Sequence, residues 1–549
     1  MHLYLYYDPR TASFIPRTVP PCEFGRRAVI LPEMATVNSM PPSAADEDRD
    51  LAAFGYQAKL DRTLGSFSSF AAGFSYLSIL TGMFQMFYVG FGAGGPAFFW
   101  TWPIVFAGQF LVALCFAELA AHCPLAGGIY QWSKHVGSGA VGWLAGWIYL
   151  ASLVISISAV ALALQITLPQ ISEHFSFFGT PLDDAATAGD NSARNAVLLG
   201  CALIAFTTLI NAVGVKLLAR INNVGVFAEL LGAILLIVLL AAHARRGPDV
   251  VFDTAGRGAG QPFGYIGPFL VAALMASYVM YGFDTAGSLA EETTHPRRRA
   301  PRAILQALTA AAVLGALLML FALMAAHDLR DPSLGTDKGG LPLIVTDSLG
   351  GTLGTVFLWD VIFAITVCTL AVQTNTVRLV FAMARDNNLP FGHSLARVST
   401  ISRTPIAPAV LAGVLSAGIL VVNVNLRGFL DLIAPVAILW ANLAYLLVTA
   451  PMLWRRLKGS PARGRSRGVK LFTLGRWGIA INALAVLWGV LMIVNIGWPR
   501  GEDGTPWYVR YGAILFTGGL VLVGGLYYGL VQRHKSGILA EHRPVRSEM

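Results

Sequence analysis

FSYLSILTGM, at residues 74–83, interrupts the first long apolar stretch of this chain, and YVMYGFDTAG, at residues 278–287, interrupts the sixth. Both segments place hydroxyl groups and a glycine at a depth where a membrane-spanning helix is usually continuous. Unpaired backbone groups are costly in lipid, so irregular helix is tolerated there only where it faces protein or a cavity. Helices interrupted at corresponding places in two halves of a chain indicate the substrate site of a secondary transporter.

The composition indicates a membrane protein with many spans. Of the 549 residues, 55% are hydrophobic and 13% are charged, and the mean hydropathy is +0.61. A soluble domain carries about 25% charged residues. The net charge of +9 fits the enrichment of Lys and Arg in cytoplasmic loops, so we expect contact with the lipid bilayer and no binding of nucleic acid.

The sequence gives no support for ATP-driven or enzymatic chemistry. The chain contains no Gly-x-x-x-x-Gly-Lys-Ser/Thr and no His-Glu-x-x-His segment, and its match to Gly-x-Ser-x-Gly, at residues 464–468, lies in a basic stretch between two predicted spans. No pair of its five cysteines has the spacing of metal ligands. We therefore expect no enzyme, no metal and no cofactor, apart from a proton or sodium ion that couples transport.

The apolar stretches predict about twelve spans, since each needs about 20 mostly apolar residues. They lie near residues 66–88, 97–121, 139–168, 195–214, 223–243, 265–288, 303–326, 353–384, 406–424, 429–454, 472–496 and 510–531. With the N-terminus inside, this count places about 29 Lys and Arg residues on the cytoplasmic side and about 9 outside. The sequence therefore predicts a multi-pass protein of the cytoplasmic (plasma or inner) membrane, with both termini in the cytoplasm.

The two ends of the chain differ from the middle. Residues 1–60 are polar and Pro-rich and lack helical periodicity, so we expect a disordered cytoplasmic tail and no signal peptide. Met34 and Met40 are alternative starts of the protein. A transporter domain over residues 61–532 and a cytoplasmic tail over residues 533–549 complete the expected organisation.

Three segments resemble those of a known family. Residues 277–304, SYVMYGFDTAGSLAEETTHPRRRAPRAI, resemble the sixth span and following loop of the amino acid–polyamine–organocation (APC) superfamily, most closely the branch of amino acid, choline and GABA permeases. Residues 124–132, PLAGGIYQW, resemble the Pro-x-Ala-Gly-Gly-x-Tyr segment between spans two and three. Gly55-Tyr56-Gln57 resembles the stretch just before the first span.

The resemblance covers about residues 54–532 and implies an all-α integral membrane fold. Ten core helices would form two inverted repeats of five, over residues 66–243 and 265–454, with two peripheral helices over 472–531. Helices 1 and 6, the first of each repeat, would be broken, which agrees with the interrupted stretches.

The first break predicts a site for a substrate carboxylate. A half-helix that starts at the break points free backbone N–H groups and the positive end of its dipole into the cavity. We expect Ser78, Leu80, Thr81 and Gly82 to bind substrate there. The alternative is that the hydroxyls bond back to their own helix and the glycine allows close packing.

The second break predicts contacts to the substrate ammonium from Tyr281, Gly282, Phe283 and Asp284. Unwound carbonyls can accept its hydrogen bonds. The resemblance implies that Phe283 stacks over the substrate as a gate, whereas the alternative is ordinary core packing. Asp284 either binds substrate, as a carboxylate within a membrane often does, or caps the second half-helix.

Glu229, in span five, is the candidate for ion coupling. Some relatives in the superfamily carry a Lys at this place, where it substitutes for sodium. A Glu buried in apolar surroundings takes up a proton more readily than an exposed one, so Glu229 is a candidate proton carrier. A partner of sodium or of a cationic substrate, or a structural hydrogen bond, are the alternatives. Ala364, Thr366 and Thr369 of span eight are expected to line the same ion site, unless their hydroxyls only bond between helices.

A cytoplasmic gate is predicted from charges that follow span six. Glu291 and Glu292 are expected to pair with Arg298 and Arg385, and the pairs would break when the gate opens inward. The alternative is a solvated cluster that only sets orientation, because exposed pairs contribute about 0–1 kcal/mol.

The sequence as a whole predicts a secondary active transporter that imports amino acids or related amines by alternating access, coupled to protons. An amine or amino acid exchanger, or a sodium-coupled symporter of choline, GABA or polyamine, is the alternative within this class. A transporter-like sensor and a channel are the alternatives outside it. The oligomeric state is left open.

Overall fold

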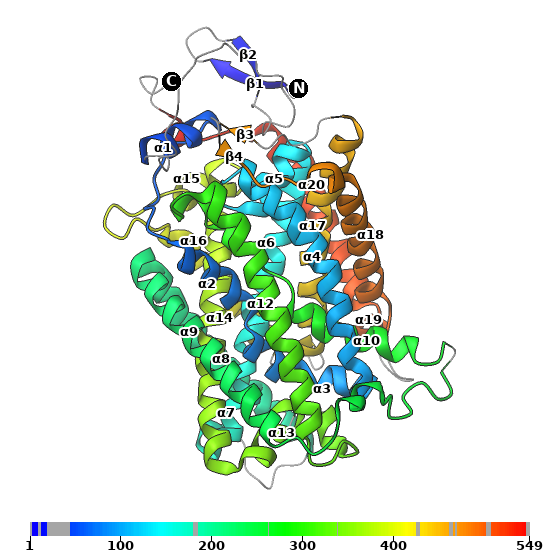
Figure 1. Cartoon of the computed structure of the whole chain (residues 1–549). Coiled ribbons are helices and arrows are strands. Elements are labelled where there is room, and N and C mark those ends of the chain that lie inside the picture. Colours follow the sequence, from blue (N-terminus) through cyan, green and yellow to red (C-terminus); the bar gives the residue numbers. More distant parts are fainter. Residues whose placement is uncertain are drawn as a thin grey trace.

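The computed structural model describes residues 3–8, 13–18, 44–178, 185–261, 263–337, 339–423, 429–459, 465–466, 469–500 and 507–544. This part of the chain is a bundle of helices with short strands beside it (Figure 1). The strands form two antiparallel hairpins, β1 (Leu3–Asp8) with β2 (Ser13–Thr18), and β3 (Arg465–Ser466) with β4 (Val469–Lys470). Both hairpins lie at the end of the bundle that also holds the two chain termini (Figure 1).

The helices fall into two consecutive sets and a C-terminal addition. The first set is α2 (Ser66–Leu77), α3 (Ile79–Gly94), α4 (Thr101–His122), α5 (Gly128–Val136), α6 (Gly139–Ala161), α7 (Ala163–Ile171), α8 (Ala185–Val213) and α9 (Val215–Ala242). The second set is α10 (Ile266–Val279), α11 (Thr285–Ser288), α12 (Pro296–Ala325), α13 (Gly340–Leu349), α14 (Gly351–Arg385), α15 (Gly392–Leu395), α16 (Ile406–Asn423) and α17 (Phe429–Leu457). The chain then adds α18 (Gly478–Gly497), α19 (Trp507–Arg510) and α20 (Gly512–Leu530).

Ten helical segments of the described chain are long and apolar enough to cross a membrane, and each overlaps one of the predicted spans. The two other predicted spans, 265–288 and 406–424, correspond to the shorter apolar helices α10 and α16. α10 is short because the chain leaves helical geometry after Val279, which is the interruption that the sequence predicts.

Both predicted breaks are present, and they confirm the fold class. Ser78 separates α2 from α3 with φ +24° and ψ +94°, an uncommon conformation for a residue with a side chain. In the sixth span, α10 ends at Val279 and α11 starts at Thr285, and Gly282 between them has φ +91°. Irregular backbone within a bundle is tolerated because side chains of neighbouring helices satisfy its polar groups.

The packing of the two sets follows an inverted repeat. Span three (α6) packs against span ten (α17), and span eight (α14) packs against span five (α9), which are equivalent pairs when the first five spans are matched to the second five. Spans four and nine (α8 and α16) also pack together. α18 and α20 lie at the edge of the bundle with mostly exposed apolar side chains, as expected of peripheral helices that face lipid (Figure 1).

The segment before the first span differs from the expected disordered tail. α1 (Ala44–Ala53) is helical, and Leu51 and Tyr56 are buried against Leu125, which precedes α5. Charged side chains of α1 add to these contacts, since Glu47 accepts the His295 N–H at 2.8 Å and Asp50 pairs with Arg297 at 3.0 Å. Residues 19–43, with both alternative starts, lie outside the described residues.

Candidate substrate and coupling site

The break in span one is held by a carboxylate from span five. Glu229 Oε1 accepts a hydrogen bond from the Ser78 hydroxyl at 2.9 Å and another from the Leu80 backbone N–H at 3.2 Å. The Ser78 hydroxyl also lies 2.6 Å from that of Thr81. A carboxylate is well placed at the start of α3, because the first N–H groups of a helix are unpaired and carry partial positive charge.

Two of the donors that the sequence assigns to a substrate carboxylate, the Ser78 hydroxyl and the Leu80 N–H, are therefore occupied by Glu229. The side chain of Glu229 is 1% exposed, and its second oxygen, Oε2, has no hydrogen-bond partner among the described residues. The sequence had assigned Glu229 and the break to different tasks, ion coupling and substrate binding. The structure brings the two together.

The two breaks touch each other through glycines. A Cβ added to Gly282 would lie 1.9 Å from a ring carbon of Tyr76, which belongs to span one. A Cβ added to Gly82 would lie 2.6 Å from a methyl carbon of Val279, which belongs to span six. These glycines let spans one and six cross at close range at the level of their breaks.

Asp284 is buried at the second break and is bound by two tyrosines. Its carboxylate accepts hydrogen bonds from Tyr149 of span three at 2.7 and 2.8 Å and from Tyr445 of span ten at 2.6 Å. The Tyr445 hydroxyl in turn accepts the Gly282 N–H at 2.8 Å. The capping role considered for Asp284 is not observed, since its side chain makes no cap bond to α11. Neither tyrosine was predicted.

Aromatic rings surround the breaks. Phe283 is fully buried, with its ring centroid 5.9 Å from that of Phe116 and 5.4 Å from that of Tyr445. The Tyr76 and Tyr281 rings meet edge to face at 5.6 Å. In this state Phe283 packs as a core residue, which was the alternative to a gate. All eight predicted substrate residues are buried, so the site is closed to both sides.

Span eight approaches the breaks with residues other than those predicted. The hydroxyls of Thr366 and Thr369 donate to carbonyls of their own helix, at 2.9 and 2.8 Å. Ala364 is buried on the same helix. The thiol of Cys368 donates to the Tyr76 carbonyl oxygen at 3.4 Å. A role of these threonines in ion binding stays a prediction.

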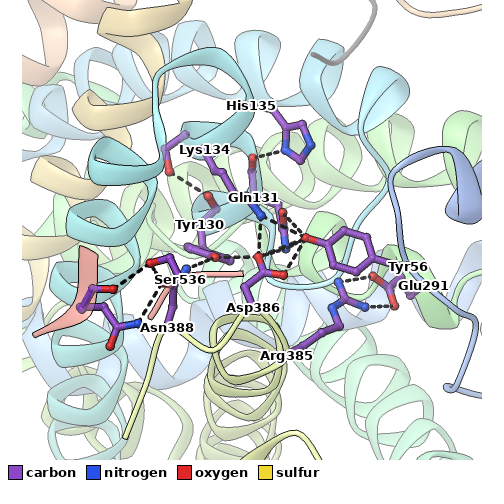
Figure 2. A network of polar contacts seen from close by, with 12 residues as sticks. Tyr56, Tyr130, Gln131, Lys134, His135, Glu291, Arg385, Asp386, Asn388 and Ser536 are labelled. Carbon is purple, nitrogen blue, oxygen red and sulfur yellow. Dashed lines mark hydrogen bonds and ion pairs between the residues drawn. The ribbon is translucent and has the colours of Figure 1, made fainter. Parts of the chain in front are cut away.

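The predicted cytoplasmic gate contains a buried ion pair. Arg385 donates two hydrogen bonds to Glu291, at 2.8 and 3.0 Å, and both side chains are less than 5% exposed (Figure 2). Glu292 pairs in the same bidentate manner with Arg378 of α14, at 2.8 and 3.0 Å. Arg298, by contrast, is exposed. The predicted pair of Glu291 with Arg385 is present, whereas Arg298 forms no ion pair with either glutamate among the described residues, because both arginines that reach them come from span eight. The role of these pairs as a gate stays a prediction.

A second polar cluster adjoins this pair (Figure 2). The Asp386 carboxylate accepts hydrogen bonds from Tyr56 at 2.9 Å, from Tyr130 at 2.7 Å and from Lys134 at 2.7 Å. Burial raises the pKa of the Asp386 carboxyl, but Lys134 and Arg385 outweigh it and hold that pKa below its usual value. Tyr56 and Tyr130 belong to the segments around Gly55 and Pro124 that carry the family resemblance. The two segments therefore meet at one carboxylate.

Comparison with known proteins agrees with this architecture. The family described as amino acid permease matches residues 64–520 of the chain. Amino-acid permease 2 of Neurospora crassa is 26% identical over 534 residues, covering 93% of this chain and 93% of the relative. The branched-chain amino acid permease BcaP of Bacillus subtilis is 25% identical, covering 82% and 91%. The methylthioribose transporter of the same bacterium is 29% identical, covering 67% and 77%.

Proposed function

The chain belongs to the amino acid permease family and is an amino acid transporter of the multi-pass membrane class, and from this premise we propose that it imports amino acids by proton symport with alternating access. We further propose that it resides in the cytoplasmic membrane with both termini inside.

The observation that carries the proposal is the pair of hydrogen bonds from Ser78 and Leu80 to Glu229. An amino acid carboxylate that enters the break needs the same donors. Two carboxylates at one site repel each other, so they cannot both be ionised there at low cost. Protonation of Glu229 removes its charge and releases the donors to the substrate. Binding of substrate and binding of a proton are thus linked.

The rest of the proposed transport cycle depends on the buried site and on the Glu291–Arg385 pair of the predicted cytoplasmic gate. With the breaks buried, a substrate leaves toward the cytoplasm only after the Glu291–Arg385 pair separates. The loss of substrate then returns the Ser78 and Leu80 donors to Glu229, which favours its ionised form and release of the proton on the same side.

The same contacts favour a substrate that carries a carboxylate over an amine that lacks one. Asp284 is the other carboxylate at the breaks, and its oxygens already accept hydrogen bonds from Tyr149 and Tyr445. A choline or polyamine head group would have to displace those hydroxyls. One relative is named for branched-chain amino acids, and the apolar side chains of such substrates would pack against the aromatic residues around the breaks. Another relative is named for methylthioribose, which is not an amino acid.

The proposal is tested with purified protein in liposomes and a panel of labelled amino acids, GABA, choline and polyamines. We expect accumulation of an amino acid only when the outside is acidic, and tighter substrate binding at acidic pH. Glu229→Gln should bind substrate with no dependence on pH and should exchange it, but should not accumulate it. Glu173→Gln, at an exposed position, serves as the control.

Accumulation by Glu229→Gln equal to that of the wild type would reject the coupling role. Exchange without net accumulation by the wild-type protein would identify an exchanger instead. Substrate binding with no transport of any compound would identify a sensor.

A further inference from the structure

A second carboxyl group lies on the same helix interface as Glu229. Asp360 of α14 places its Oδ2 atom where a side chain at Gly232 of α9 would begin, 1.8 Å from an ideal Cβ. On the same face of α9, Gly225 is similarly close to Val367 of α14, at 2.3 Å. Positions 225, 229 and 232 follow the spacing of one helix face. Glu229 therefore faces α14 between these two points of close contact.

The two carboxyls are neighbours along the interface. Gly232 lies three residues from Glu229, which is about 4.5 Å along the helix axis. Asp360 is near enough to Glu229 to act on it electrostatically.

Each carboxyl has an oxygen without a partner. Glu229 Oε2 and Asp360 Oδ2 are buried atoms that make no hydrogen bond with the described residues. A buried carboxylate oxygen with no hydrogen-bond partner is unfavourable, so each of these oxygens is free to take a proton. A proton that passes between two carboxyl groups needs a free oxygen on each of them, and this interface provides both.

Among the described residues that face Glu229, Asp360 is the other carboxyl group. The α14 side presents Cys368 and Asp360 to Glu229. The α2–α3 side presents the hydroxyls of Ser78 and Thr81. Residues 303–325 of α12, which also packs on α9, contain no ionisable side chain. Asp347 of α13 is exposed.

The places of Asp360 and Glu229 along their helices indicate the direction in which a proton would move. Asp360 lies nine residues from the start of α14, at the end that the span count places outside, and it retains partial exposure. Glu229 lies deeper and is almost fully buried. Trp359 and Val356 beside Asp360 are exposed apolar residues of the lipid-facing surface.

We propose that Asp360 is a proton-carrying residue that delivers the coupling proton from the outer side to Glu229, an inference that rests on the proposed proton symport. The proton leaves the Asp360 carboxyl and binds Glu229 Oε2, so that Asp360 becomes the carboxylate and Glu229 the neutral acid. Asp360 then regains a proton from the outer solution. Gly232 is required because only glycine leaves room for the Asp360 carboxyl against α9.

The test compares Asp360→Asn with Asp347→Asn in liposomes. For Asp360→Asn we expect accumulation driven by a pH gradient to slow by at least roughly tenfold, since a positioned proton carrier contributes about 10²–10⁴-fold. Exchange, which moves no net proton, and the pH dependence of substrate binding, which belongs to Glu229, should persist. The infrared band of a protonated carboxyl in the wild-type protein should lose intensity in Asp360→Asn. Asp347→Asn should behave as the wild type.

Gly232→Ala gives an independent test, because it displaces the Asp360 carboxyl without removing it. Gly232→Ala should also slow accumulation while exchange persists. If Asp360→Asn does not bind substrate, the result for Gly232→Ala decides the test. Wild-type accumulation rates in both variants would overturn the role of Asp360. If Glu229→Gln alone then loses accumulation, proton symport stands without this path; if Glu229→Gln also accumulates normally, the proposed function fails as well.

Discussion

The backbone N–H of Gln57 donates a hydrogen bond to the carbonyl oxygen of His542, at 2.9 Å. It joins the segment before span one to the segment after the last span. The C-terminal segment is itself attached to the C-terminal end of α14, where Leu539 N–H donates to the Arg385 carbonyl at 3.0 Å and Gly537 N–H donates to that of Asp386 at 2.9 Å. Any movement of span one away from span eight must separate these two terminal segments.

Removal of residues 532–549 should therefore make the inner gate easier to open. The deletion eliminates the backbone contacts at Arg385 and Asp386 and the Gln57–His542 bond. Cys368, buried beside the breaks, should then react faster with a thiol reagent added from the cytoplasmic side, in a background whose other cysteines are serine. Glu541→Gln, which removes only an exposed pair with His393, is the control. Equal labelling of deletion and control would show that the terminal segments do not restrain the gate.

Glu291→Gln should lower the thermal stability of the protein. The substitution leaves the Arg385 guanidinium buried without its counter-ion, and breaking a buried pair in this way costs about 3–5 kcal/mol. Unfolding temperature in detergent measures the effect. The double variant Glu291→Gln with Arg385→Gln should recover part of the loss, because no buried charge remains unpaired. Glu541→Gln should change little, since exposed pairs contribute about 0–1 kcal/mol. A double variant less stable than the single one contradicts this account.

His135 makes stability depend on pH. Burial and the neighbouring Lys134 lower the pKa of His135 to about 4, while the hydrogen bond with the Gln131 carbonyl and the charge of Asp386 act in the opposite direction. Between pH 6.5 and about 4 the unfolded chain binds a proton at this site and the folded protein does not, so stability falls as the pH drops through that window. The pKa of Asp386 is held below its usual value, so its own loss of stability comes at still lower pH.

His135→Asn should reduce that dependence. Asn retains a donor for the Gln131 carbonyl, which lies 2.7 Å from His135 Nδ1, but it does not titrate. The loss of unfolding free energy between pH 6.5 and 5 should shrink by about 2 kcal/mol at most, because one pKa unit corresponds to about 1.4 kcal/mol. Unfolding temperatures at the two pH values give the measurement, and an unchanged difference would assign the acid sensitivity to other groups.

Sequence reasoning succeeded where local pattern determines structure. The spans follow from apolar length, and the breaks follow from polar residues and a glycine within an apolar stretch, as Ser78 and Gly282 show. Glu229 was recognisable because an ionisable side chain within a span is energetically unfavourable and is usually kept only for a function. Each of these signals is contained in a single segment.

The parts that were missed depend on how segments meet. Tyr149 and Tyr445 are ordinary aromatic residues of apolar spans, and only the crossing of spans three, six and ten directs both hydroxyls to Asp284. Arg385 and Arg298 are equally basic in the sequence, but α14 carries only the former to Glu291. Asp360 is also an acid within a predicted span, but its contact with Gly232 appears only when α9 and α14 pack together.

Of the glycines Gly282, Gly82 and Gly267, we expect substitution by alanine to be tolerated least at Gly282, in the second break. Gly282→Ala would place a Cβ 1.9 Å from the Tyr76 ring and would hold alanine at φ +91°, so both sterics and backbone oppose it. Gly82→Ala brings a Cβ to 2.6 Å from a Val279 methyl, without a positive φ, and a small shift can relieve it. Gly267→Ala meets no atom within 4 Å and is the control.

Transport should therefore be near normal in Gly267→Ala, reduced in Gly82→Ala and abolished in Gly282→Ala, as measured by initial uptake rates at equal amounts of monodisperse protein. Adding Tyr76→Ala to Gly282→Ala removes the clash but not the backbone strain, which for a side chain at positive φ is about 1–2 kcal/mol. The double variant should thus recover folding more than uptake, because Tyr76 also forms the wall of the site. Uptake by Gly282→Ala at the level of Gly267→Ala would mean that the breaks do not need to stay in contact during transport.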